Sequence, residues 1–232
     1  MTARTRSSRS PGRPNRIDRD AIADAVLELA SEGIDALTVQ RVADALGVQR
    51  SAIYHYVDGR DGLLHVLAER LAERLVLPEP GDDWRSYLRA SFSATVEACA
   101  RYPGAIELIY NNVWPLPDRF MTSAMQLIEN LTGYGMPLEL ATAAADLISN
   151  FAVDETRRVE RIQRLAANGA GFTDGVVPGR PETEATRVAM KDHYDAGPDF
   201  WVETKLGILL DGIELRFDRH RARPDPNGDG HG

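Results

Sequence analysis

One segment near the N-terminus carries side chains that suit contact with DNA. Arg50 can donate two hydrogen bonds to guanine O6 and N7, and the methyl group of Ala52 can meet the methyl group of thymine. Tyr54, Tyr56 and Arg60 suit phosphate oxygens, contacts that position a protein on the duplex without reading its sequence. The set that we expect at DNA is Thr38, Gln40, Gln49, Arg50, Ser51, Ala52, Tyr54, Tyr56 and Arg60, with Arg13 and Arg16 from the residues before it.

Two short helices joined by a tight turn would present these side chains. Thr38 is a suitable N-cap for a helix over 38–45, and Gly47 stands where a left-handed turn residue is needed. A second helix is expected over 49–56, with Ile53 facing inward, and the small Ala43 lets the two helices approach closely. In such a helix-turn-helix the second helix enters the major groove while the first braces it.

The segment 18–67 resembles the DNA-binding domain of TetR-family regulators. The family pattern is present as Leu37-Thr38, Ala45-Leu46-Gly47-Val48, Ile53-Tyr54-His55-Tyr56-Val57 and Leu63-Leu64. Arg60 replaces the lysine that the family usually has at the start of the fourth helix, which keeps the charge. The resemblance implies a regulator that binds double-stranded operator DNA; the alternative is an ordinary buried helical hairpin.

The charge of the chain is unevenly distributed. The 232 residues carry a net charge of −8, but residues 1–17 hold five arginines and no acidic residue. Residues 1–60 have a net charge of +1 and residues 61–232 one of −9. A basic front on an acidic body can bind phosphate at one end only, although a solvated basic tail is the simpler interpretation of the arginines alone.

The periodicity of apolar residues predicts an all-α protein. Besides the two helices above, we expect helices over 18–32, 60–76, 84–101, 104–112, 117–134, 137–167, 182–194 and 199–220. The predicted organisation is a flexible basic arm (1–16), a three-helix helix-turn-helix domain (17–62), a helical domain for effector binding and dimerisation (63–220) and a disordered tail (221–232). A Gly- and Pro-rich loop is expected over 168–181.

The last helix is apolar on two sides, which predicts burial on two sides. Together with 84–101 and 138–161, it resembles the C-terminal domain of the tetracycline-repressor branch, which implies a homodimer formed by a four-helix interface. Burial of the helix inside one subunit is the alternative. The residues that we expect in the dimer interface are Leu147, Val202, Leu206, Leu209, Ile213 and Phe217.

The helical body is expected to hold a small organic effector between its helices. Aromatic and apolar side chains would form the walls, and a few polar groups would fix the orientation of the ligand. The candidate residues are Ser91, Phe92, Thr95, Tyr110, Asn111, Trp114, Met125, Asn150 and Phe151. Tetracycline repressors hold a magnesium–drug complex through two histidines, and the matching positions here are Val76 and Leu108, so the sequence argues against that ligand.

No catalytic, cofactor or metal site is expected. Cys99 is the only cysteine, and the sequence has no nucleophile elbow, phosphate loop or dinucleotide-binding glycine pattern. No apolar run is long enough for a membrane helix, so we expect a cytoplasmic protein without membrane contact. The expected function is a repressor released by its effector. Open alternatives are an activator, a ligand-independent regulator, or a helical enzyme or carrier that retains the motif.

Overall fold

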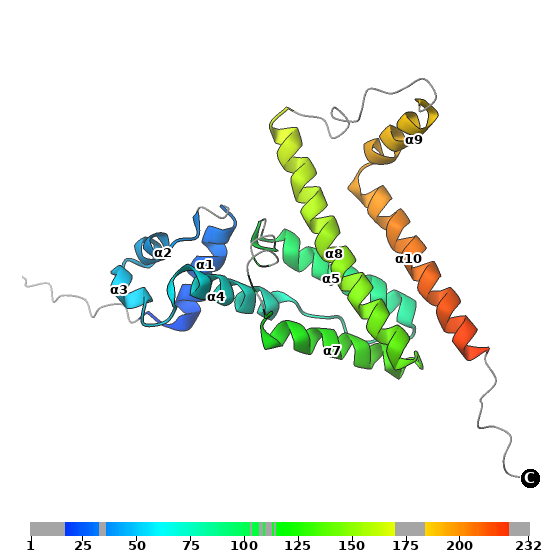
Figure 1. Ribbon diagram of the computed structural model, residues 1–232, viewed down its shortest axis with the longest axis horizontal. Coiled ribbons are helices and arrows are strands. Elements are labelled where there is room, and N and C mark those ends of the chain that lie inside the picture. The colour runs from blue at the N-terminus through cyan, green and yellow to red at the C-terminus, as the bar shows by residue number, and fades with distance from the viewer. Residues whose placement is uncertain are drawn as a thin grey trace, which may run out of the picture.

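The computed structural model describes residues 17–32, 36–102, 104–106, 109, 113, 115–169 and 184–222 (Figure 1). All regular elements within these ranges are helices, in agreement with the predicted all-α class. The predicted arm (1–16), with Arg13 and Arg16, lies outside the described residues, as do most of the predicted loop and nearly all of the predicted tail. None of the described helices is long and apolar enough to cross a membrane.

Four helices form the N-terminal part of the molecule. These are α1 (Arg19–Ala30), α2 (Val39–Leu46), α3 (Arg50–Ile53) and α4 (Gly59–Arg74). Asp18 caps α1, since its side chain accepts a hydrogen bond from the backbone of Ala21 at 2.8 Å. Gly47 ends α2 in the left-handed conformation, with φ of 66°, as the turn of the motif requires.

The predicted third helix is longer than the observed one. Its hydrogen bonding tightens after Ile53, where the backbone N–H of Tyr56 donates to the carbonyl oxygen of Ile53 at 2.9 Å. An i→i+3 bond of this kind closes a helix rather than extending it. Residues 54–56 therefore form a turn, and the recognition helix has only its four residues from Arg50 to Ile53.

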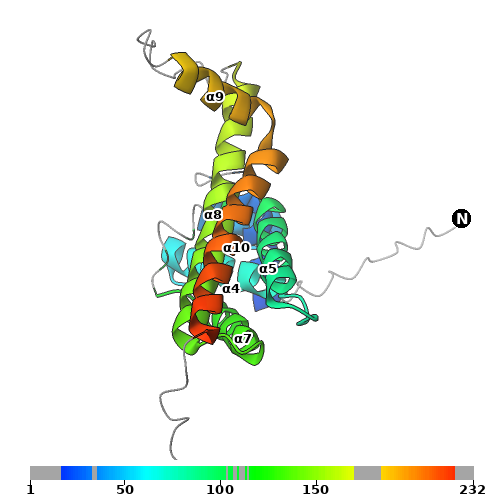
Figure 2. The ribbon, with the colours of Figure 1, turned by 90° about the vertical axis from the view of Figure 1, so that its right-hand side faces the viewer.

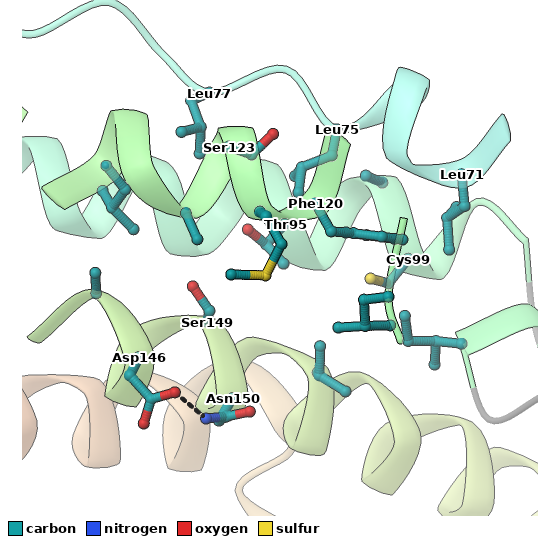
Figure 3. Close-up of a pocket in the computed structure, with 18 of the residues that line it drawn as sticks. Leu71, Leu75, Leu77, Thr95, Cys99, Phe120, Ser123, Asp146, Ser149 and Asn150 are labelled. Carbon is teal, nitrogen blue, oxygen red and sulfur yellow. Dashed lines mark hydrogen bonds between the residues drawn. The ribbon is translucent and has the colours of Figure 1, made fainter. Parts of the chain in front are cut away.

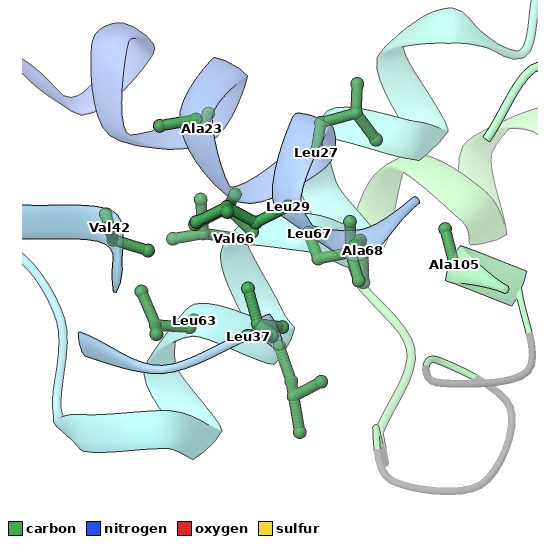
Figure 4. Packing of buried hydrophobic residues seen from close by; sticks show 14 of the residues in the cluster. Ala23, Leu27, Leu29, Leu37, Val42, Leu63, Val66, Leu67, Ala68 and Ala105 are labelled. Carbon is green, nitrogen blue, oxygen red and sulfur yellow. The ribbon is translucent and has the colours of Figure 1, made fainter. Parts of the chain in front are cut away.

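A long hydrophobic core holds α1, α2 and α4 together and continues beyond them. Ile22, Val26, Leu63 and Leu67 are almost fully buried in it. Figure 4 shows the leucines of α1 and α4 facing one another, with Ala105 approaching from the chain that follows α5. The same core includes Cys99, Ala105, Ile106, Ile109 and Val113. The N-terminal helices therefore do not pack as an independent unit.

Arg70 adds a polar link between α4 and α1. Its guanidinium donates hydrogen bonds to Asp24 and Glu73, at 2.5 and 2.8 Å, and lies 3.5 Å from Asp20. The bonds to Asp24 and then Glu73 raise the pKa of Arg70 above its ordinary value, so the side chain stays charged at any physiological pH. This pairing adds to the contact that α1 and α4 make through the hydrophobic core.

The remaining helices build the body. They are α5 (Trp84–Ala100), α7 (Asp118–Gly133), α8 (Leu138–Ala167), α9 (Glu184–Asp195) and α10 (Pro198–Arg221). Figure 1 shows α8 and α10 running side by side, with α5 behind α8 and α7 below, and Figure 2 shows α5 beside α10. Leu88, Leu131 and Ile148 form a second core with the inward face of α10.

Ion pairs link α10 to α5. Arg85 of α5 binds Glu214 at 2.9 Å and also pairs with Asp211, and Arg89 pairs with Glu203. These acidic residues lie on the side of α10 that faces α5, where the burial of Leu206 and Phe217 in the second core contributes more than the exposed ion pairs do. The opposite side of α10 is left uncovered.

Candidate DNA-binding surface and ligand cavity

Most of the predicted DNA-contacting side chains that the structure describes are exposed, on α2, α3, the start of α4 and the residues beside them. Ala52 is the exception, because it is half-buried beside Ile53. Some of the others already have partners: the hydroxyl of Thr38 accepts from the backbone of Arg41, and the amide of Gln40 donates to Asp44 at 2.7 Å. The exposed members of the set are Thr38, Gln40, Gln49, Arg50, Ser51, Tyr54, Tyr56 and Arg60.

Arg50 lies against Tyr54, one helical turn further on. Its guanidinium donates to the tyrosine hydroxyl at 3.1 Å and lies 5.8 Å from the centre of the ring. This contact restricts the long arginine side chain before any DNA is bound, which lowers the entropy cost of a base contact. The bond uses one of the five guanidinium N–H groups and leaves the others for a guanine.

The structure places Tyr56 differently from the sequence-based expectation. Its hydroxyl donates to the backbone carbonyl of Ile17 at 2.7 Å, so its only hydroxyl hydrogen is committed within the protein. A phosphate oxygen accepts hydrogen bonds, and Tyr56 could serve one only by giving up this contact. This hydrogen bond instead holds Ile17 beside the turn that follows the recognition helix.

A cavity of about 370 Å³ opens between α4, α5, α7 and α8 (Figure 3). Its interior is mostly apolar, and its polar side chains come mainly from α8, where Asp146 and Asn150 lie at the exposed side. The residues that line it are Leu71, Leu75, Leu77, Thr95, Ala98, Cys99, Ile106, Ile109, Leu116, Phe120, Met121, Ser123, Ala124, Leu127, Ile128, Thr142, Ala145, Asp146, Ser149, Asn150 and Val153. A helix-lined space of this size and character suits a small organic ligand.

Two of the predicted pocket residues, Thr95 and Asn150, line this cavity. Phe92 and Phe151 do not, because they stack on each other at 5.1 Å within the second core. The hydroxyl of Ser91 is buried and donates to the carbonyl oxygen of Tyr87 at 2.8 Å, while 52% of the Met125 side chain is exposed. Tyr110, Asn111 and Trp114 lie outside the described residues.

Sequence reasoning missed the leucines at the end of α4 that line the cavity. Leu71 and Leu75, the residue that follows the helix, continue its apolar stripe, and periodicity does not distinguish them from the core leucines. It also missed Asp146, whose only signal was a charged residue within an apolar stretch of α8.

Cys99 lies at the inner end of the cavity and is almost fully buried. Burial raises the pKa of its thiol from 9.0 to about 12, and the nearby Glu160 adds to the effect. The thiol is therefore a poor nucleophile at neutral pH and acts as an apolar wall residue.

The predicted dimer residues divide between the inside and the outside of the protomer. Leu206, Ile213 and Phe217 are buried against α5 and α8, and Val202 and Leu209 are half-buried. Their burial in the second core determines which apolar side of α10 faces the protomer. The outward apolar side chains of α10 are instead Ile208 and Leu215, near the exposed Leu147 of α8.

Comparison with known proteins gives the family. The sequence pattern of "Bacterial regulatory proteins, tetR family" matches residues 21–67. The tetracycline repressor protein class A from transposon 1721 of Escherichia coli is 30% identical over 205 residues, which cover 87% of this chain and 92% of the repressor. The chain belongs to the TetR family. It is accordingly a DNA-binding transcriptional regulator.

Other TetR-family proteins match over most of the chain. The repressor DrrR1 of Streptomyces coeruleorubidus is 26% identical over 238 residues, covering 95% of this chain and 85% of that protein. The crystal structure of ActR from Streptomyces coelicolor in complex with actinorhodin has a TM-score of 0.74 and 23% identity, covering 89% of this chain and 99% of ActR. The fold of the residues that the structure describes is thus the TetR fold.

The residues present do not fit the magnesium–tetracycline site of the tetracycline-repressor branch. Val76 stands at one of the two expected histidine positions, and its side chain has no ligating atom and is 73% exposed. Leu108, at the other position, lies outside the described residues. Within the described part of the chain, no three His, Cys, Asp or Glu side chains are grouped so as to hold a metal ion.

Proposed function

We propose that this regulator is a homodimeric repressor, released from its operator by a small, largely apolar organic molecule bound in the cavity. One observation carries the proposal: the cavity and the core under the DNA-binding helices share a wall. Leu71, Cys99, Ile106 and Ile109 line the cavity and are also members of the first hydrophobic core. The side chains that a ligand touches therefore also support α1 and α4.

This shared wall gives a ligand a direct mechanical route to the DNA-binding surface. A ligand that fits the cavity better when Leu71 and Ile106 are displaced favours the displaced arrangement over the original one. Because packed cores respond by discrete repacking, α4 then changes its angle and carries the recognition helix with it. Couplings of this type are typically about 1–3 kcal/mol and act in both directions.

The uncovered side of α8 and α10 supports a dimer. A shallow apolar groove there is lined by Leu140, Ala143, Ala144, Leu147, Ile208, Leu209, Gly212, Ile213 and Arg216. Ile208 is 66% exposed and Leu215 52% exposed, which is unfavourable for a protein that stays monomeric. A second copy packed on this face by a two-fold axis would form a four-helix bundle and cover both side chains.

A dimer of this kind would read a pseudo-palindromic operator. Two recognition helices about one turn of DNA apart, roughly 34–36 Å, would contact two half-sites, and a change in their separation would lower operator affinity. We place the division between the DNA-binding domain (17–62) and the effector and dimer domain (63–220) within α4, which packs against both. We place the protein in the cytoplasm, where it would meet DNA.

A gel-shift titration with the DNA upstream of the regulator's own gene tests the proposal. We expect sequence-specific binding. The logarithm of the binding constant should fall linearly with the logarithm of the salt concentration, because phosphate contacts release counterions. Addition of apolar compounds that raise the melting temperature of the protein should release the DNA. Equal affinity for a scrambled duplex at every salt concentration would contradict sequence-specific operator binding. If none of the stabilising compounds releases the DNA, the proposal of release by an effector is wrong.

A further inference from the structure

The polar groups of the cavity are mostly hydrogen-bond acceptors. The hydroxyls of Thr95, Ser123 and Thr142 donate to the carbonyl oxygens of Ser91, Arg119 and Leu138 in their own helices, at 2.9, 3.1 and 2.8 Å. A hydroxyl has one hydrogen, so each of these oxygens can offer a ligand only its lone pairs. The three hydroxyl oxygens therefore all present a partial negative charge to a ligand.

Asn150 and Asp146 extend this pattern at the mouth of the cavity. The amide nitrogen of Asn150 donates one of its two N–H groups to Oδ1 of Asp146 at 3.0 Å, which leaves the amide oxygen and the second carboxylate oxygen as acceptors and one N–H as a donor (Figure 3). Both residues are exposed on one face of α8, next to Ser149, whose hydroxyl can donate or accept. The mouth thus holds one negative charge, and the acceptor oxygens around it outnumber the donors.

The lining of the cavity carries negative charge only. Asp146 is the only charged side chain among the described residues that line the cavity, and no lysine, arginine or histidine is part of that lining. An anionic ligand would lose its hydration and meet a carboxylate with no compensating cation, which is costly in an apolar space. A cationic ligand would place its charge at the solvent-exposed mouth and its apolar part inside.

We infer that the effector is an amphiphilic cation, with an apolar body of ring systems or branched chain and a protonated amine that binds Asp146. Further N–H or O–H donors on the body would bond to Thr95, Ser123 and Thr142. This inference rests on the proposed function, since it names the class of ligand for the same cavity. It excludes carboxylates, phosphate esters and sulfates as effectors.

Three probes with the same tricyclic body test the inference by isothermal titration calorimetry. They are 9-(aminomethyl)anthracene, 9-anthracenemethanol and 9-anthracenecarboxylate, which differ in charge and not in ring system. The full-length protein is titrated without DNA, because flat cations also bind DNA. We expect the amine to bind about tenfold more tightly than the alcohol, and the carboxylate more weakly than both.

Two variants of α8 locate the charge effect. In Asp146→Asn the preference for the amine over the alcohol should fall to about twofold or less, while the alcohol binds as before. Asp154→Asn is the matched control, because Asp154 is an exposed carboxylate on the same helix that is not part of the cavity lining, and it should keep the full preference. Ala124→Trp places a large side chain in the cavity from its half-buried wall, so weaker binding of every probe to this variant shows that the probes occupy the cavity.

The outcomes separate this inference from the proposed function. Binding of the carboxylate as tight as that of the amine, an unchanged preference in Asp146→Asn, or binding of none of the probes overturns the inference. The proposed function stands if the carboxylate or the alcohol binds in the cavity, more weakly in Ala124→Trp, and releases DNA in the gel shift. The amine preference without any release of DNA supports the ligand class and contradicts the repressor mechanism.

Discussion

Glu160 of α8 accepts a hydrogen bond at its Oε2 from the backbone N–H of Gly104, with a donor–acceptor distance of 3.2 Å. Gly104 has a positive φ of 81° and is followed by Ala105 and Ile106, both buried in the core beneath the DNA-binding helices. The carboxylate thus ties the longest helix of the body to the chain segment that supports the DNA-binding helices. Glu160 is a positioning residue for that segment.

Replacement of Glu160 by alanine should loosen this segment. Loss of a charge-assisted hydrogen bond at a half-buried site should lower the free energy of unfolding by about 1 kcal/mol, and effector binding should release DNA less completely. Urea unfolding and a gel shift with effector measure the two effects. Gln163→Ala, at an exposed position on the same helix, is the control, and an equal loss in both variants would contradict the assigned role.

The buried thiol of Cys99 makes stability depend on pH in the alkaline range. Its pKa is about 12 in the folded protein and 9.0 when unperturbed, so between these values the unfolded chain releases a proton that the folded protein retains. The contribution is complete below pH 9 and is lost as the pH rises toward 12. We expect the free energy of unfolding to fall by about 1 kcal/mol between pH 9 and pH 10 from this group alone.

The difference between wild type and Cys99→Ala isolates the thiol, because other groups titrate identically in both proteins. Urea unfolding at intervals from pH 8 to pH 10.5 should show a steeper decline for the wild type. Parallel curves for the two proteins would mean that the thiol ionises at an ordinary pH and is accessible to solvent.

The helix-turn-helix could be predicted closely from the sequence because local rules determine it. Asp18 and Thr38 are side-chain caps, and Gly47 is the residue that a left-handed turn needs, so each boundary has a signal within one helical turn. The length of α3 was overestimated because Tyr54 and Tyr56 are compatible with a helix, and the contact of Tyr56 with Ile17 is remote in sequence.

The rotation of α10 could not be predicted in the same way. Its apolar residues occur on two sides, and periodicity does not show which side faces the protomer's own core. Leu206 and Phe217 pack against residues of α5 and α8 that are remote in sequence, and the ion pairs with Arg85 and Arg89 join residues more than a hundred positions apart. The cavity is subject to the same limit, because wall leucines and core leucines have the same periodicity.

Ile208→Asp should convert the protein into a folded monomer. Its side chain is 66% exposed in the protomer, so the substitution costs little in the fold, whereas in a two-fold interface it would bury a charge against its own copy. Size-exclusion chromatography with light scattering should show half the mass, and operator affinity should fall with it. Val76→Asp, at a 73% exposed position outside the groove, should leave the mass unchanged. Equal mass for both variants would place the dimer interface elsewhere.

Arg50 and Arg60 should affect DNA binding in two different ways. Loss of Arg50 in Arg50→Ala should cost about 1–3 kcal/mol on the preferred operator and much less on operators altered at one base pair, since a bidentate base contact discriminates by that amount. Arg60→Ala should weaken binding evenly across all sequences and reduce the salt slope by about one, because a phosphate contact carries no sequence information.

A gel-shift series over single-base operator variants at several salt concentrations distinguishes the two residues. Tyr54→Phe removes the hydroxyl that holds Arg50 at 3.1 Å, and it should reduce the same base preference by a smaller amount than Arg50→Ala. If Arg50→Ala weakens all operators equally while Arg60→Ala relaxes a single position, the roles are reversed. The start of α4 would then enter the major groove in place of α3.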